Sequence, residues 1–192
     1  MSRTVTIGLR AKTAKAIAVV LSEPATSPEF VHREQLTLAD EAIPATMQPY
    51  HEVMELPWNE SVAAVQPTIE AIQKIASACL AKLIRDLQSK NFRVKAIAVV
   101  GSADRLLERI GNSHIRAHAA EGILFRRVLE IGAKANHCAC LGFSDELERT
   151  AKAELQGDVK KTLARLGKTA GPPWRSDEKS AAIAAWIALA RR

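Results

Sequence analysis

The sequence has 192 residues, of which 47% are apolar and 25% are charged, a balance typical of a globular chain with a buried core. Three cysteines, an odd number, argue against a disulfide framework, and no apolar run reads as a membrane span or a secretory signal. We therefore expect one soluble domain over residues 1–192, in the cytoplasm and without a membrane partner.

The net charge of +6 is concentrated in the second half of the chain. Residues 101–192 hold 16 Lys and Arg against 11 Asp and Glu, whereas residues 1–100 hold 11 against 10. Such a skew is compatible with a surface for a polyanion, but many proteins of similar charge bind neither DNA nor RNA. Charge alone leaves this question open.

The first predicted element is a β-hairpin over residues 4–22. In its first strand Val5, Ile7 and Leu9 alternate with polar or small residues, so they form the apolar face. Arg10 projects from the opposite face, at the end of that strand. The first strand therefore ends with a cation on the face opposite its apolar residues.

A third strand is predicted over residues 30–38, after a connection that contains proline and serine. Residues 39–58 contain three prolines and are expected to be irregular. The longest helix follows over residues 59–90, and Pro67 either bends it or sets its true start.

A buried strand is predicted over residues 92–100, because the sequence FRVKAIAVV is apolar and rich in β-branched residues. Strands of this kind usually have parallel neighbours. Asn112 or Ser113 can cap the next helix, which we expect to reach Ile131 and to stop at Gly132.

Another short strand is predicted over residues 134–142, and a charged amphipathic helix over residues 144–167. Residues 171–174 break the chain, and Asp177 opens a final alanine-rich helix. The order of elements is βββαβαβαα. This order favours an α/β fold in which a mixed sheet, with three antiparallel strands and then parallel strands, is flanked by helices.

Together with several local segments, this order resembles the RNase H-like superfamily, and within it the RuvC-type Holliday-junction resolvases. Each segment alone has low specificity, so the inference depends on their order and spacing across most of the chain. The segments are Ile7–Leu9 in the first strand, Ala96–Val100 in the fourth, Arg116–Leu124 in the next helix, Gly132 before the fifth strand, and Asp177 with Ser180–Ala185 in the last helix.

The resemblance implies a nucleic-acid substrate and two divalent ions on carboxylates from the first strand, the fourth strand and the start of the last helix. Two cations about 4 Å apart orient the attacking water and stabilise the leaving oxygen. Here the match fails in three places: Arg10 replaces the first acid, residues 97–100 contain no acid, and Ser180 replaces the second acid of the last pair, one helical step after Asp177. We expect no metal and no cofactor, with Mg²⁺ or Mn²⁺ needed only if nuclease activity is retained.

The main hypothesis is a degenerate member of this superfamily that binds DNA or RNA without cutting it. Its phosphate contacts would come from Arg10, Lys12, Lys15 and Arg116. Aromatic residues are only 4% of the chain and do not alternate with basic ones, so contacts to the nucleic-acid backbone should dominate over base stacking.

Two alternatives remain open. The chain could be a metal-dependent endonuclease whose acids have moved, with Asp104, Asp177 and Glu178 as candidate catalytic residues. Acids at a helix start also stabilise the helix dipole without any catalysis. The third hypothesis is a structural or protein-interaction module that binds no polyanion.

Two further groups of residues are candidate metal ligands. His114 and His118 lie four residues apart on the predicted helix and could share a face with Glu121, but such pairs without a ligand on another element are more often surface residues. On a strand, Cys138 and Cys140 face away from His137, so we expect free cysteines packed as small apolar residues.

The last helix carries two further expectations. Trp174 and Trp186 are predicted to anchor it on the sheet. The same helix is rich in alanine, which allows close approach of backbones, so we also expect that it could pack against a second copy and form a homodimer.

Overall fold

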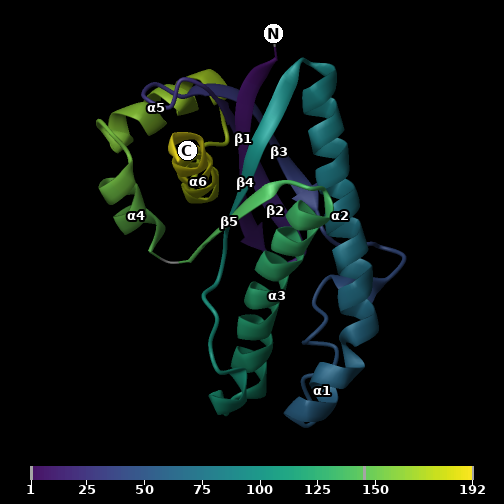
Figure 1. Ribbon diagram of the computed structural model, residues 1–192. Helices are drawn as coiled ribbons and strands as arrows, with labels where there is room; N and C mark the ends of the chain where they lie inside the picture. Colours follow the sequence, from purple (N-terminus) through teal and green to yellow (C-terminus); the bar gives the residue numbers. More distant parts are fainter. Residues whose placement is uncertain (1, 145, 192) are drawn as a thin grey trace.

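The computed structural model describes residues 2–144 and 146–191, and within them a mixed sheet separates two groups of helices (Figure 1). Five strands are present in this part of the chain, in the order β3-β2-β1-β4-β5. The central strand β1 pairs antiparallel with β2 and parallel with β4, which confirms the predicted fold class. The strands are β1 (Arg3–Lys12), β2 (Lys15–Ser22), β3 (Glu29–Thr37), β4 (Phe92–Val100) and β5 (Ala139–Phe143).

The helices cover both faces of the sheet. Helices α2 and α3 pack on one face, and α6 lies on the other, with α4 and α5 beside it (Figure 1). Among the described residues the helices are α1 (Trp58–Ala64), α2 (Gln66–Ser89), α3 (Ser113–Ala135), α4 (Leu147–Glu154), α5 (Val159–Ala170) and α6 (Ser176–Ala190), with 3₁₀ turns η1 (Pro44–Thr46) and η2 (Leu107–Arg109). None of these helices is long and apolar enough to span a membrane.

Strand β1 is buried on both of its faces. Its alternating residues Val5, Ile7 and Leu9 are fully buried in the core that α2 and α3 form with the sheet. The opposite face, with Thr6 and Gly8, packs against α6. This two-sided burial explains why the central strands are apolar along most of their length.

Helix α6 approaches β1 closely because both partners have small side chains. The Thr6 hydroxyl donates a hydrogen bond of 2.7 Å to the Ala185 carbonyl, and a Cβ on Gly8 would lie 1.8 Å from the carbonyl oxygen of Ala181. The alanines of α6 are therefore buried within this chain. The composition that suggested a homodimer is explained by the packing of α6 on the sheet.

The tryptophan anchors are confirmed. Trp186 on α6 is 1% exposed, and its indole N–H donates to the Ala25 carbonyl at 2.7 Å. Trp174 donates to the Leu163 carbonyl and meets Phe30 of β3 edge to face. Both side chains fix the last helix against the rest of the chain.

The predicted helix over residues 59–90 is divided into α1 and α2, and Pro67 is the second residue of α2. A proline lacks an N–H donor and is best tolerated in the first turn of a helix, so it sets the start of α2.

The expected stop at Gly132 is wrong, because α3 continues to Ala135. A Cβ on Gly132 would lie 3.2 Å from Leu80 Cδ1 on α2, so this glycine allows two helices to pack closely. The chain turns only at His137, whose φ is 57°. Strand β5 therefore begins at Ala139, later than the predicted residue 134.

The predicted helix over residues 144–167 is also wrong, because the structure has two shorter helices there, α4 and α5. Gly157 has a φ of 89°, which favours glycine and ends any continuous helix. Asp158 then caps α5, because its Oδ1 accepts a hydrogen bond of 3.0 Å from the Lys161 N–H.

Candidate functional site

The carboxyl ends of three parallel strands meet at one edge of the sheet. Arg10 near the end of β1 is opposite Val100 of β4, which in turn is opposite Phe143 of β5. Ligand sites of parallel α/β sheets usually lie at this edge. The first turn of α6 lies beside it and brings in Asp177.

Asp177 is held by two cations from β1. Its Oδ1 lies 3.7 Å from Arg10 Nε, and its Oδ2 lies 3.6 Å from Lys12 Nζ. All three side chains are about one-third exposed, so water reaches the group, although Arg10 Nε itself is buried and has no hydrogen-bond partner among the described residues. The guanidinium and the ammonium carry two positive charges against the one negative charge of the carboxylate, so the group has a net positive charge.

Glu178, the next residue, is part of the cap of α6. It is 6% exposed, and its Oε2 accepts a hydrogen bond of 2.8 Å from the Arg175 N–H. This bond satisfies one of the free N–H groups at the helix start, which is the structural role that an acid at this position can serve without catalysis.

Asp104 lies after the end of β4 and binds two arginines of α3. Its Oδ1 accepts hydrogen bonds from Arg126 and from Arg127, the latter at 3.2 Å. Arg126 also donates to the Ser102 carbonyl at 2.9 Å, and it packs against Gly101. Asp104 lines a hollow with residues of β5, whereas Asp177 lines a different cleft. No interaction joins these two acids within the described residues.

Two clefts lie on either side of the first turn of α6. The first, of about 500 Å³, opens between this turn and strands β2 and β3, and we call it the hairpin cleft. The second, of about 440 Å³, opens between this turn, the ends of β1 and β4, and α4, and we call it the strand-end cleft. Together with Lys12, the charged residues that line them are six cations (Arg10, Lys12, Lys15, Arg33, Arg175 and Lys179) and four acids (Glu34, Glu148, Asp177 and Glu178) among the residues described.

Lys15 lines the hairpin cleft together with Arg33 of β3. Arg33 donates hydrogen bonds to the carbonyls of Gly171 and Pro172, at 3.0 and 3.1 Å, and to that of Pro173. These contacts hold the segment before α6 against β3. Arg33 shapes the cleft, while Lys12 and Lys15 are exposed beside it.

Arg116 does not join this group. It lies in the first turn of α3, where its guanidinium covers the Trp58 ring at 5.4 Å and donates to the Ile110 carbonyl. Arg126 is level with the end of β4, and Arg116 precedes it by ten residues, or about 15 Å of helix. The sequence suggested Arg116 as a phosphate contact alongside Arg10, but it could not show how far from the sheet edge α3 begins.

The residues at this edge do not fit a pair of divalent ions. Such a site needs several carboxylates that converge on the cations. Here Asp177 is shared by Arg10 and Lys12, Glu178 is used in the cap of α6, and Ser180 offers a hydroxyl. A positive guanidinium lies beside Asp177, and the other acid that lines the strand-end cleft, Glu148, comes from α4.

The cysteines behave as apolar residues. Cys138 and Cys140 are half-buried beside the core, and burial, with a smaller contribution from the nearby Glu130, raises the pKa of Cys140 to about 11. Burial therefore disfavours the thiolate form of this side chain.

Sequence reasoning missed one ligand of a possible metal site. His114 and His118 do have a further histidine on another element, because His51, from the segment between η1 and α1, lies against both rings. Glu121 contacts His51 directly. No periodicity marks His51 in an irregular segment, so only the three-dimensional structure brings it to α3.

No protein-family model matches the sequence, and no curated protein matches it either. Among solved structures, the chain is similar to Thermus thermophilus RuvC in complex with Holliday junction substrate, with a TM-score of 0.52, 9% identity, and coverage of 96% of this chain and 91% of RuvC. A second T. thermophilus RuvC structure gives a TM-score of 0.52 with 11% identity, and covers 95% of this chain and 91% of that chain. The chain thus has the RNase H-like fold of RuvC, which confirms the predicted resemblance.

Proposed function

We propose that this protein binds nucleic acid at the clefts around the first turn of α6 and does not cut it by two-metal chemistry. The observation that carries the proposal is the pairing of Arg10 and Lys12 with Asp177 at the carboxyl edge of the sheet. A nuclease that uses two metal ions needs net negative charge at this edge, whereas a phosphate-binding surface needs cations.

The arrangement of charge supports a phosphate ligand. Lys12 and Lys15 are exposed at the turn of the β1–β2 hairpin, where Lys12 pairs with Asp177 and Lys15 lines the hairpin cleft. The solved RuvC complex contains a Holliday junction, so a protein with the same fold provides a surface for branched DNA. Contacts from lysine and arginine to phosphates are independent of sequence and weaken as salt competes for the nucleic acid.

The aromatic residues support backbone contacts in place of base stacking. Trp174 and Trp186 are packed against the chain by their hydrogen bonds to Leu163 and Ala25, and Trp58 lies beneath Arg116. A surface that binds single strands by stacking needs exposed aromatic rings beside basic residues. We therefore infer that double-stranded or branched DNA or RNA is the partner, recognised by its shape and phosphates.

The test is binding of labelled four-way junction, linear duplex and single strands, measured by fluorescence anisotropy across a salt series with and without Mn²⁺. The expected result is tighter binding of the junction or the duplex than of the single strand, a steep loss of affinity with salt, and intact substrate on a gel. Cut product in Mn²⁺ would instead support an endonuclease with displaced acids, and no binding at low salt would favour a protein-interaction module.

A matched pair of double variants locates the surface. Lys12→Ala/Lys15→Ala should weaken binding and reduce the slope of log affinity against log salt by about 2, since each phosphate contact contributes about 0.9. The control, Lys74→Ala/Lys90→Ala, removes one exposed charge within α2 and one directly after its end. Because α2 packs on the other face of the sheet, this variant should bind nucleic acid as the wild type does. Equal losses in both variants would show that only the net charge matters and would contradict the assigned surface.

A further inference from the structure

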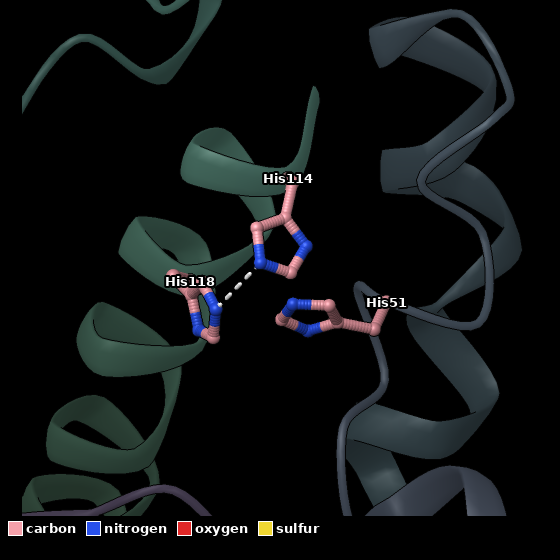
Figure 2. A group of neighbouring side chains, drawn as sticks. All are labelled: His51, His114 and His118. Atoms are coloured by element: carbon pink, nitrogen blue, oxygen red, sulfur yellow. Dashed lines mark hydrogen bonds between the residues drawn. The ribbon is translucent and has the colours of Figure 1, made fainter. Parts of the chain in front are cut away.

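Three histidines converge near the N-terminal end of α3, away from the clefts at α6. His114 and His118 come from the first two turns of α3, and His51 comes from the segment before α1. Figure 2 shows the three rings facing a common space between α3 and this segment. We propose that His51, His114 and His118 bind one divalent transition-metal ion, of which zinc is the example tested below.

The spacing of the nitrogens fits a single ion. His114 Nε2 lies 3.1 Å from His118 Nε2, and the ligand atoms of all three histidines lie within 4.8 Å of one another. Two nitrogens bound to one tetrahedral zinc ion at about 2.05 Å are about 3.3 Å apart. The helical pair is already spaced as two ligands, and the third nitrogen needs to move by at most about 1.5 Å.

His51 is oriented by a buried carboxylate. Glu121 has 0% exposure, and its Oε1 lies 2.8 Å from His51 Nδ1. Because a carboxylate accepts, Nδ1 is the donor, so in the neutral ring the lone pair is on Nε2. His51 Nε2 is buried without a hydrogen-bond partner among the described residues, and Figure 2 shows this edge of the ring turned toward His114 and His118.

This arrangement matches the way proteins prepare a histidine for a metal. A ligating histidine usually donates its other ring N–H to a carboxylate, which fixes the tautomer and the direction of the ring. A bound cation would also compensate the charge of Glu121, whose Oε2 has no partner in the part of the chain described. One ion therefore explains the unpartnered His51 nitrogen and the buried acid together.

The ligand set indicates which ion would bind. Three imidazoles without a thiolate or a direct carboxylate suit zinc, copper or nickel, whereas magnesium and calcium prefer oxygen. His114 and His118 are exposed, so a fourth position of a tetrahedral ion is open to water. A metal here would also link the irregular segment before α1 to α3.

The test begins with the full chain, stripped of metal by EDTA and titrated with Zn²⁺ against a chromogenic chelator. We expect one zinc per chain, a rise in the melting temperature with zinc, and the intense visible absorption of tetrahedral cobalt when Co²⁺ replaces it. Wild-type protein that binds no zinc, or that gives only the weak spectrum of octahedral Co²⁺, would overturn the proposal.

Variants separate the three-histidine site from an exposed helical pair. His118→Ala should abolish tight binding, and Glu121→Gln, which keeps the size of the side chain, should weaken it about 10- to 100-fold by loss of support for His51. His137→Asn changes an exposed histidine outside the cluster and should bind zinc as the wild type does. Wild-type affinity in both Glu121→Gln and His51→Gln would show that the helical pair acts alone, and would contradict the proposal.

Discussion

At the scale of single residues, Arg10 places a positive charge at the carboxyl edge of the sheet. Its guanidinium is a permanent cation with several donors, and it lies beside Asp177 where the resemblance to resolvases implies a divalent ion. Lys12 adds a second positive charge to the same carboxylate. The protein thus carries its own cation at this place, covalently attached to β1.

Replacing this cation with an acid tests its role. Arg10→Asp would place a second carboxylate beside Asp177, and we expect it to lower the free energy of unfolding by about 1–2 kcal/mol and the melting temperature by about 3–6 °C. Mn²⁺ should recover part of the loss, because two adjacent carboxylates can share a divalent ion. Thermal unfolding with and without Mn²⁺ measures both effects.

Arg10→Gln is the control for this change, because it removes the cation without adding an acid. It should lose less stability than Arg10→Asp and should not respond to Mn²⁺. An Arg10→Asp melting temperature equal to that of the wild type in both conditions would show that the ion pair has no energetic role.

The sequence predicts some of these residues and not others, for physical reasons. Arg10 and Asp177 can be assigned to a strand end and a helix start from local patterns, so their meeting follows once the sheet order is known. His51 has no such pattern, because it lies among prolines in a segment without periodicity. Arg116 lies away from Arg10 because α3 begins well beyond the sheet edge, and a helix pattern does not give that distance.

At the scale of elements, the contact of β1 with α6 depends on the absence of a side chain. A Cβ at residue 8 would lie 1.8 Å from the Ala181 carbonyl oxygen and 2.8 Å from the Ala185 nitrogen, and both are backbone atoms of α6. Backbone cannot rotate away as a flexible side chain can. The helix would have to move off the sheet.

We therefore expect Gly8→Ala to lower the free energy of unfolding by about 3 kcal/mol or more. Gly111→Ala is the matched control, because nothing lies within 4 Å of the position that its Cβ would occupy. Urea unfolding followed by circular dichroism compares the two. Similar stability of both variants would contradict the close packing of α6 on β1.

Glycines also explain which element boundaries were predictable. Gly132 and Gly157 look alike in the sequence, yet Gly132 lies inside α3 against α2, and Gly157 ends the helical region at a φ of 89°. The difference is set by a neighbouring helix, which local sequence cannot reveal. Pro67, by contrast, acts through its own missing N–H, and the start of α2 beside it is one of the two effects that the sequence predicted.

At the scale of the whole molecule, two apolar cores share one sheet. Leu83 of α2 is buried in the first core and Ile187 of α6 in the second, on opposite faces of the same strands. Because β2 and β4 contribute side chains to both cores, and β1 also packs against α6, unfolding of one face would uncover strands that the other face needs. We propose that the described chain unfolds as one cooperative unit.

Cavity-forming variants test this cooperativity. Leu83→Ala and Ile187→Ala should each lower the free energy of unfolding by about 2–5 kcal/mol. Each should shift the same single transition, with equal midpoints by circular dichroism and by tryptophan fluorescence and an unchanged dependence on urea. Separate midpoints for the two signals in either variant would show that the two faces unfold independently.

The hydrogen bond from Thr6 to Ala185 joins positions 179 residues apart, and this separation matters while the protein is being made. The second face of β1 has no cover until α6 has been synthesised. At about 5–20 residues per second, ribosomes need roughly 10–35 s to add that stretch. During this time the face of β1 that carries Thr6 and Gly8 stays uncovered, so α6 can pack on the sheet only after translation has passed through it.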